Sequence, residues 1–324
     1  MNGPLLQVSG LKKYFPVKKD TYFEKQRYLK AVDGVSFEIF KGETLGLVGE
    51  SGCGKSTTGK MIVKLLNPSE GKIQYEGEEI FSAAPAKARE LRKKVQMIFQ
   101  DPYSSLDPRM SAGRIIMEPL TVHGVKEGAK ERVLSIMDDV GLLREYYDRY
   151  PHEFSGGQRQ RIGVARALAL NPSLVICDEP VSALDVSIQA QIVNLMQDLQ
   201  DKYKLTYLFI SHDLRIVKHI CDRIAVMYLG RIVELAPKDE IFDSPLHPYT
   251  RALLSAIPDS DPEQSKEALP ILGDVASPID PPSGCHFHPR CPDCMDICRK
   301  SSPVMTESSP GHTVECHLYS AERS

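Results

Sequence analysis

One stretch of the sequence combines glycines, a lysine and a serine in an order suited to phosphate binding. The residues Gly49-Glu50-Ser51-Gly52-Cys53-Gly54-Lys55-Ser56, with Thr57 next, match the pattern G-x-x-x-x-G-K-[ST]. The glycines let successive backbone N–H groups converge on a phosphate, and the start of the following helix adds partial positive charge. Lys55 supplies a full charge to the outer phosphates of a nucleotide, and the Ser56 hydroxyl can bind Mg²⁺.

Two carboxylates follow a second apolar run, residues 174 to 177. Asp178 is placed to hold Mg²⁺ through water, and Glu179 can position or deprotonate a water that attacks the outermost phosphate. An Asp-Glu pair after a strand is by itself more often the solvated start of a loop. Together with the phosphate loop, the pair predicts a catalytic site.

A second glycine turn lies between these two motifs, at Ser155-Gly156-Gly157-Gln158. At the start of a helix, such a turn offers a hydroxyl and free amides to an anion. It has no lysine and no preceding strand, so it cannot be a complete phosphate loop. The alternative is an ordinary helix cap, in which Ser155 bonds the amides that follow.

Cysteines crowd near the end of the chain, at Cys285, Cys291, Cys294, Cys298 and Cys316. In a reducing cytosol this cluster indicates metal rather than disulfides. Four thiolates can close a zinc site or hold a [4Fe–4S] cluster. A zinc site could use the Cys291-x-x-Cys294 pair, and reduced cysteines without metal are the third interpretation.

The elements that must position these residues alternate along the first 255 residues. Apolar runs predict strands at 44–48, 174–177, 206–210, 224–228 and 231–235. Helical spacing predicts a helix after the phosphate loop with Met61, Ile62, Leu65 and Leu66 on one face, and further helices over 186–200 and 249–257. This alternation is typical of an α/β domain with a largely parallel sheet. Between residues 100 and 166 helical patterns dominate, which indicates an inserted helical subdomain at about 101–165.

Length and composition are those of an ordinary globular chain of about two domains. It has 324 residues and a net charge of −3, which argues against a generic polyanion binder such as a nucleic-acid protein. No apolar run is long enough to cross a membrane, and no secretory signal is evident. The composition changes near Ser255, so we expect domains at 1–255 and 256–324, the second a small Cys-rich module.

In its order of motifs the sequence resembles the nucleotide-binding subunits of ABC transporters. The series is the phosphate loop, Gln100, Ser155 to Gln158, Asp178-Glu179, Asp185 and His212. The resemblance covers roughly residues 5 to 255. It implies a P-loop NTPase (RecA-like) core with an antiparallel β subdomain and an inserted helical subdomain. It also implies a head-to-tail dimer in which each ATP touches the phosphate loop of one subunit and Ser155 to Gln158 of the other.

The resemblance also implies residue roles. Gln100 would sense Mg²⁺ and the attacking water, and His212 would contact the γ-phosphate. Asp185 would lie at the dimer seam. Tyr14 would stack on adenine, although the adjacent Phe15 competes for that role and either aromatic could simply be core.

A second resemblance narrows the branch. ATPases of oligopeptide and dipeptide importers have a string similar to Ser244-Pro245-Leu246-His247-Pro248-Tyr249-Thr250. The opening residues 11–17 look more like the second of the two ATPases of these importers than the first. Taken alone, the string is a Pro-stiffened loop that opens a helix. Related importers carry nickel or sugars, which are the alternative cargo. Other ABC ATPases serve DNA repair or translation. The repair type contains a long coiled coil and the translation type two cassettes in one chain, and this sequence shows neither feature.

From this resemblance we expect ATP hydrolysis that powers peptide import. The expected partners are a like or sister ATPase, two transmembrane permease subunits and, indirectly, an extracytoplasmic peptide-binding protein, with the chain peripheral on the cytoplasmic side of the membrane. Some relatives carry an iron–sulfur cluster whose ligands resemble Cys285, Cys291, Cys298 and Cys316, which would leave Cys294 spare.

Overall fold

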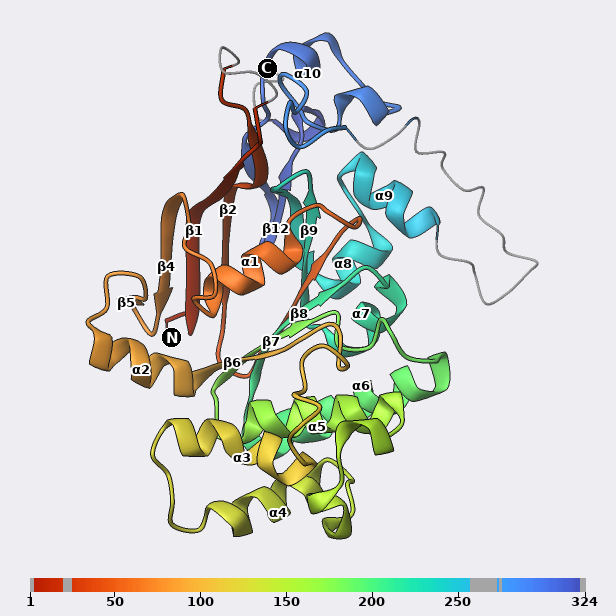
Figure 1. Ribbon diagram of the computed structural model, residues 1–324. Coiled ribbons are helices and arrows are strands. Elements are labelled where there is room, and N and C mark those ends of the chain that lie inside the picture. Colours follow the sequence, from red (N-terminus) through yellow and green to blue (C-terminus); the bar gives the residue numbers. More distant parts are fainter. Residues whose placement is uncertain (1–2, 20–24, 257–272, 274–275, 321–324) are drawn as a thin grey trace, which may run out of the picture. The chain divides into compact units, whose positions relative to one another are not determined.

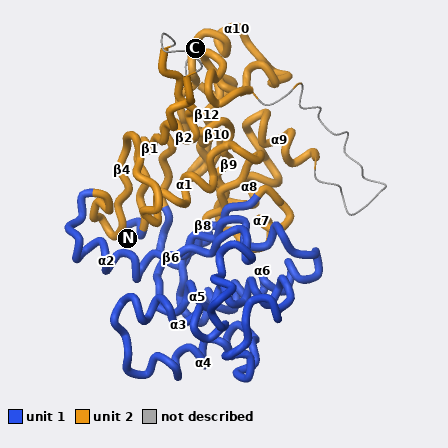
Figure 2. Tube along the Cα trace, viewed as in Figure 1, with its two compact units in different colours: residues 1–5, 39–44, 82–211 blue, residues 6–38, 45–81, 212–324 orange. Residues whose placement is uncertain are grey.

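The computed structural model describes residues 3–19, 25–256, 273 and 276–320. Contacts divide the chain into two compact units, coloured separately in Figure 2. Unit 1 comprises residues 1–5, 39–44 and 82–211, and unit 2 comprises 6–38, 45–81 and 212–324. The clustered cysteines therefore belong to the same unit as the phosphate loop. The domain boundary expected at residue 255 is not a boundary of these units and stays a prediction.

The strands of unit 1 are parallel. β6 (Val95–Ile98) pairs with β7 (Leu174–Asp178), and β7 pairs with β8 (Thr206–Ser211). Every residue of β7 and β8 is buried, as expected for short apolar runs in a sheet covered on both faces. The two predicted strands are confirmed, each one residue longer at its carboxyl end. That end is where parallel sheets bind ligands, and Asp178 lies there.

Helices make up most of the rest of unit 1. They are α2 (Pro85–Lys94), α3 (Ala112–Val122), α4 (Ala129–Asp139), α5 (Gly156–Leu168) and α6 (Val186–Tyr203), with 3-10 helices at Arg144–Asp148 and Pro151–Glu153. α3, α4 and α5 pack against one another (Figure 1). The apolar face of α3 provides Ile115, Ile116 and Leu120 to this packing, all buried. No strand interrupts the described chain between β6 and β7.

Unit 2 contains an antiparallel sheet in the order β2-β1-β4-β5. Its strands are β1 (Leu6–Pro16), β2 (Tyr28–Ile39, with Ile39 counted in unit 1), β4 (Glu70–Tyr75) and β5 (Glu78–Glu79). β1 runs antiparallel to β4, with Val8 opposite Ile73, and both of these side chains are buried. Tyr14 lies near the end of β1.

A second sheet of unit 2 runs β11-β12-β10-β9-β3. Its strands are β3 (Thr44–Val48, with Thr44 counted in unit 1), β9 (Arg223–Tyr228), β10 (Arg231–Pro237), β11 (Met305–Ser309) and β12 (His312–Glu315). β3 and β9 are parallel, whereas β9–β10, β10–β12 and β11–β12 are antiparallel. The C-terminal hairpin therefore extends a sheet of the core, a pairing that the polar run from 305 to 315 did not reveal.

The helices of unit 2 are short. They are α1 (Lys55–Ile62), α7 (Leu214–Ile220), α8 (Lys238–Asp243), α9 (Pro248–Ser255) and α10 (Asp296–Lys300), with 3-10 helices at His288–Arg290 and His317–Tyr319. The prediction that α1 runs on to Leu66 is wrong. Lys64 adopts the left-handed conformation, with φ of 59°, and Leu65 is 57% exposed, so the apolar pattern outlasts the helix. Ile257, the predicted end of α9, lies outside the described residues.

A single buried carboxylate connects the C-terminal hairpin to the start of α9. Glu234 of β10 accepts hydrogen bonds from the backbone N–H groups of Leu246 and His247, at 2.7 and 2.9 Å. It also pairs with the ring of His312 on β12 at 2.8 Å. Among the described residues, no helix combines the length and apolar character needed to cross a membrane.

Candidate functional site

The phosphate loop joins β3 to α1 within unit 2. Gly54, at the N-cap of α1, has φ of 110°, and a Cβ there would lie 2.1 Å from the backbone oxygen of Ala31, so only glycine fits. Lys55 is only 4% exposed. Its Nζ donates to the backbone oxygens of Gly49 and Glu50, at 2.7 and 2.9 Å. The loop thus closes around its own lysine, which keeps the ammonium beside the backbone amides that would bind phosphate.

An aromatic cluster supports this loop from within unit 2. The backbone N–H of Glu50 donates to the hydroxyl of Tyr249 at 3.0 Å, and Tyr249 comes from α9. The Tyr249 ring packs on Tyr228 and Phe287, with centroids 4.7 and 5.4 Å away. His247 caps α9 by accepting the N–H of Tyr249 on Nδ1, at 3.0 Å. The Pro-stiffened string at 244–250 therefore supplies a hydrogen bond to the phosphate loop, a role that its local pattern did not show.

The carboxylates after β7 lie in unit 1 together with Gln100. Asp178 is 3% exposed. Glu179 adopts a left-handed backbone conformation, with φ of 46°. This conformation is energetically unfavourable for residues other than glycine, and it is often found at functional sites. The Nε2 of Gln100, just after β6, donates to Oε2 of Glu179 at 2.9 Å. The structure thus brings together the predicted sensor glutamine and the predicted general base, although they are 79 residues apart.

The Ser155 turn starts α5, also in unit 1. The Ser155 hydroxyl accepts the N–H of Gln158 at 3.3 Å, and the Gln158 amide oxygen accepts the N–H of Ser155 at 3.0 Å. This reciprocal pair is a capping box. A Cβ on Gly157 would lie 2.7 Å from Ile188 of α6, so the turn needs glycine for close packing as well. The helix-cap interpretation is confirmed, and it leaves the anion-binding interpretation open.

The remaining predicted residues flank helix starts. Asp185 is the N-cap of α6, where its backbone oxygen accepts the N–H groups of Ile188 and Gln189 at 2.9 Å. His212 follows β8 and belongs to unit 2, directly before Asp213, whose carboxylate caps α7. Tyr14, the phosphate loop and His212 thus belong to unit 2. Unit 1 holds the others, namely Gln100, Ser155 to Gln158, Asp178, Glu179 and Asp185.

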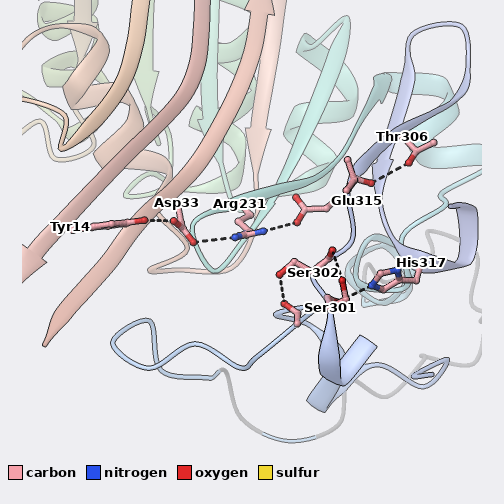
Figure 3. Close-up of polar contacts among 10 residues, drawn as sticks. Tyr14, Asp33, Arg231, Ser301, Ser302, Thr306, Glu315 and His317 are labelled. Carbon is pink, nitrogen blue, oxygen red and sulfur yellow. Dashed lines mark hydrogen bonds and ion pairs between the residues drawn. The ribbon is translucent and has the colours of Figure 1, made fainter. Parts of the chain in front are cut away.

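Tyr14 is the first member of a polar chain that reaches the C-terminal module (Figure 3). Its hydroxyl donates to Asp33, Asp33 pairs with Arg231 at 3.3 Å, and Arg231 pairs with Glu315 at 3.0 Å. Burial, together with the bond to Asp33, raises the pKa of Tyr14 well above its usual value. The pKa of Asp33 is lowered because the bond from Tyr14 and the charge of Arg231 outweigh the effect of burial. Asp33, Arg231 and Glu315 come from three other strands, β2, β10 and β12, and share no motif with Tyr14.

The clustered cysteines are all free thiols. The backbone N–H of Cys285 donates a hydrogen bond to the backbone oxygen of Cys298 at 2.8 Å. Burial raises the pKa of Cys285 to about 12, and the nearby thiols of Cys298 and Cys316 add to the shift. The pKa of Cys291 is likewise raised to about 12 by burial, with Cys316 and Cys285 adding to it. No group of three or more His, Cys, Asp or Glu side chains in the described part of the chain is arranged to hold a metal ion.

Comparison with known proteins gives matches over most of the chain. Residues 32–182 match the family described as "ABC transporter", and residues 233–298 match "Oligopeptide/dipeptide transporter, C-terminal region". The chain is 52% identical to the oligopeptide transport ATP-binding protein AppF of Bacillus subtilis, over 98% of each chain. It is 51% identical to the dipeptide transport ATP-binding protein DppF of Haemophilus influenzae, over 97% of each.

Solved structures agree with these matches. The chain resembles the ATP-binding cassette MJ0796, solved as a dimer in a post-hydrolysis state bound to ADP and Pi, with a TM-score of 0.63 and 26% identity. That match covers 72% of this chain and 98% of the cassette. It also resembles cbiO1 from Clostridium perfringens, part of the transporter complex cbiONQ, with a TM-score of 0.63 and 26% identity over 74% of this chain and 91% of that one.

Proposed function

The chain belongs to the ATP-binding subunits of the oligopeptide and dipeptide ABC transporters, and we propose that it hydrolyses ATP to power peptide import, with Glu179 as the general base. The expected P-loop core with mixed α/β sheets is confirmed. The observation that carries the residue-level proposal is the hydrogen bond between Gln100 and Glu179, in a chain that also folds its phosphate loop around Lys55.

The nucleotide binds at the phosphate loop in this proposal. Lys55 moves part of its hydrogen bonding from the loop carbonyls to the outer phosphates, and the backbone N–H groups from Gly49 to Thr57 surround them. Oxygen donors suit Mg²⁺, and the chain offers the Ser56 hydroxyl, the Gln100 amide and the buried Asp178 carboxylate. Bound Mg²⁺ would neutralise charge that develops on the phosphates. Tyr14 supports adenine with its ring.

Glu179 is the general base in this proposal. Its carboxylate accepts a proton from the attacking water while Gln100 keeps it oriented through the 2.9 Å hydrogen bond. The left-handed backbone at Glu179 fixes where the side chain starts. His212 contacts the γ-phosphate from the end of β8.

A second copy of a cassette completes the site. Ser155 to Gln158 begin a helix of three turns, and the N-terminus of such a helix attracts anions. We propose that this turn and Asp185 face the nucleotide of a partner ATPase, whether identical or a sister chain. The similar cassette MJ0796 was solved as a dimer bound to ADP and Pi, which supports pairing of two cassettes. Two permease subunits and a peptide-binding protein outside the cell complete the importer, and the chain is peripheral on the cytoplasmic side of the membrane.

Substitution of the general base tests the catalytic proposal. Glu179→Gln keeps the shape and the contact with Gln100 but cannot accept a proton, so hydrolysis should fall by at least about a hundredfold. Affinity for ATP, measured by equilibrium binding on the full chain, should stay within about twofold. Lys55→Ala is the matched control, since it should lose binding itself. Near-normal hydrolysis in Glu179→Gln would refute the role of Glu179.

We further propose that Cys285, Cys291, Cys298 and Cys316 bind an iron–sulfur cluster, with zinc as the alternative. Support comes from their spacing and from the backbone hydrogen bond that joins Cys285 to Cys298. In the described part of the chain, these four thiols are not arranged as a closed metal site. We therefore assign no step of ATP hydrolysis to a metal bound by these cysteines. Iron, sulfide and zinc analysis of protein purified without oxygen tests this. About four irons per chain supports the cluster, one zinc the alternative, and neither metal refutes both.

A further inference from the structure

An arginine of the C-terminal module pairs with the phosphate loop. Arg290 ends the 3-10 helix that precedes Cys291. Its two terminal nitrogens lie 3.0 and 3.2 Å from the two carboxylate oxygens of Glu50, the second residue of the loop. The Arg290 side chain is 8% exposed and that of Glu50 is 23% exposed. This bidentate geometry is the strongest form of an arginine–carboxylate ion pair, and partial burial reduces its screening by salt.

Arg290 is itself held in place from several sides. Its guanidinium lies 5.8 Å from the centre of the Tyr228 ring, and the Tyr228 hydroxyl accepts from it at 3.5 Å. Phe287, three residues earlier and 1% exposed, packs on the same ring at 5.2 Å. Although burial disfavours its charge, the pKa of Arg290 is raised because Glu50 and Tyr228 accept its hydrogen bonds. Arg290 is therefore a fixed cation at this place.

Another part of the C-terminal region lies beside the same loop. A cavity of about 250 Å³ is lined by residues 50–53 of the phosphate loop, by Tyr228 and Leu229, and by residues 276–278. Arg290 and residues 276–278 thus both approach the loop, although they follow it in sequence by more than two hundred residues.

Glu50 is an unfavourable residue beside a triphosphate unless its charge is compensated. Its backbone oxygen accepts from Lys55 and its backbone N–H donates to Tyr249, so its main chain is part of the phosphate-binding loop. A bare carboxylate there would repel the phosphates and compete for Lys55. At a separation of a few ångströms and with partial burial, such repulsion is only weakly screened by solvent. The pair with Arg290 removes this repulsion and fixes the loop.

We propose that Arg290 is a positioning residue of the ATP site, which neutralises Glu50 and so makes the C-terminal module part of the nucleotide-binding machinery. The inference rests on the proposed function, because it takes ATP as the ligand of the phosphate loop. If Arg290 acts by neutralising Glu50, loss of the arginine should weaken ATP binding and loss of the carboxylate should not. A contact that only supports the fold predicts weaker binding in both cases.

The test measures ATP dissociation constants of the full chain in four forms: wild type, Arg290→Gln, Glu50→Gln and the double variant. Arg290→Gln should raise the constant about tenfold, since it leaves a partly buried charge uncompensated. Glu50→Gln should bind ATP more tightly than wild type, since a cation remains beside the phosphates. The double variant should return to within about threefold of wild type, since neither charge is left. Arg299→Gln, an exposed arginine of the same module, is the matched control and should change nothing.

The outcomes separate the possible failures. Unchanged affinity in folded Arg290→Gln, or a double variant as weak as Arg290→Gln, overturns the inference. If Arg290→Gln does not fold, the sign of the change in Glu50→Gln decides, because a contact that only supports the fold predicts weaker binding. Absence of ATP binding in the wild type would instead refute the proposed function. Arg290→Lys keeps the positive charge but cannot make the bidentate contact, so its ATP affinity should lie between those of Arg290→Gln and wild type.

Discussion

The phosphate loop and the Ser155 turn are both glycine-rich helix starts, but the chain stabilises them in opposite ways. At Glu50 the loop is joined to Tyr249 and Arg290, which are 199 and 240 residues away. The Ser155 turn satisfies its polar groups within four residues, by the capping box with Gln158. The phosphate loop thus takes polar partners from distant parts of unit 2, whereas the Ser155 turn takes its polar partners from the first turn of its own helix.

This difference matches the roles proposed for the two turns. A site that binds ATP before any partner arrives gains from being fixed in advance, because ordering it later would reduce affinity. A surface that meets the nucleotide of another subunit needs only to present its hydroxyl and amides. The phosphate loop should therefore depend on distant residues, whereas the Ser155 turn should tolerate their loss.

Acid should produce the largest difference between the two regions, through His247. Burial lowers the pKa of His247 from 6.5 to about 3, so its neutral form is the one that the fold stabilises. That contribution is complete above pH 6.5 and is lost as the pH falls toward 3. By pH 5 it should cost about 2 kcal/mol, or about thirtyfold in the unfolding equilibrium.

Denaturant unfolding at pH 7 and pH 5 measures this loss, with His247→Asn as the control. Asparagine can still cap α9 but does not titrate, so this variant should lose about 2 kcal/mol less than wild type between the two pH values. Equal losses in both proteins would show that His247 does not make α9 sensitive to acid. The capping box at Ser155 has no titratable member and should be unaffected.

Removal of one hydroxyl should have the next largest effect. Tyr249→Phe keeps the packed ring but leaves the N–H of Glu50 without its acceptor, a loss worth about 1 to 3 kcal/mol. ATP affinity of the full chain should fall about tenfold while the far-ultraviolet spectrum stays the same. Tyr203→Phe, which removes a hydroxyl paired with Asp139 in unit 1, is the control and should bind ATP normally. An equal loss in both variants would contradict the special role of α9.

Ser155→Ala should give the smallest effect on ATP binding. The loss of the cap costs about 1 kcal/mol of helix stability, and affinity of the isolated chain for ATP should stay within about twofold. Hydrolysis by the paired ATPases should fall several-fold, because the serine would act on the nucleotide of the partner. Weakened ATP binding by the isolated chain would instead show that the turn contributes to the nucleotide site of its own chain.

How far the sequence predicts the structure follows the same division. The motifs that act through neighbours, such as Lys55 after Gly54 or Ser155 before Gln158, are visible in the sequence because their chemistry is local. Buried strands such as β7 are visible as apolar runs. The pairs Arg290–Glu50 and His312–Glu234 are not predictable in this way, because polar residues far apart in the sequence carry no shared period. The end of α1 was also missed, since apolar spacing continues past Ile62.

The position of Arg290 has a consequence for how the protein is made. The ribosome releases the phosphate loop well before Arg290, so during translation Glu50 lacks this partner until 240 more residues have been added. A chain that stops after residue 255 contains every nucleotide motif, but it lacks both Arg290 and β12. Premature termination or a protease cut in the tail would therefore yield a fragment that looks complete by its motifs and binds ATP poorly.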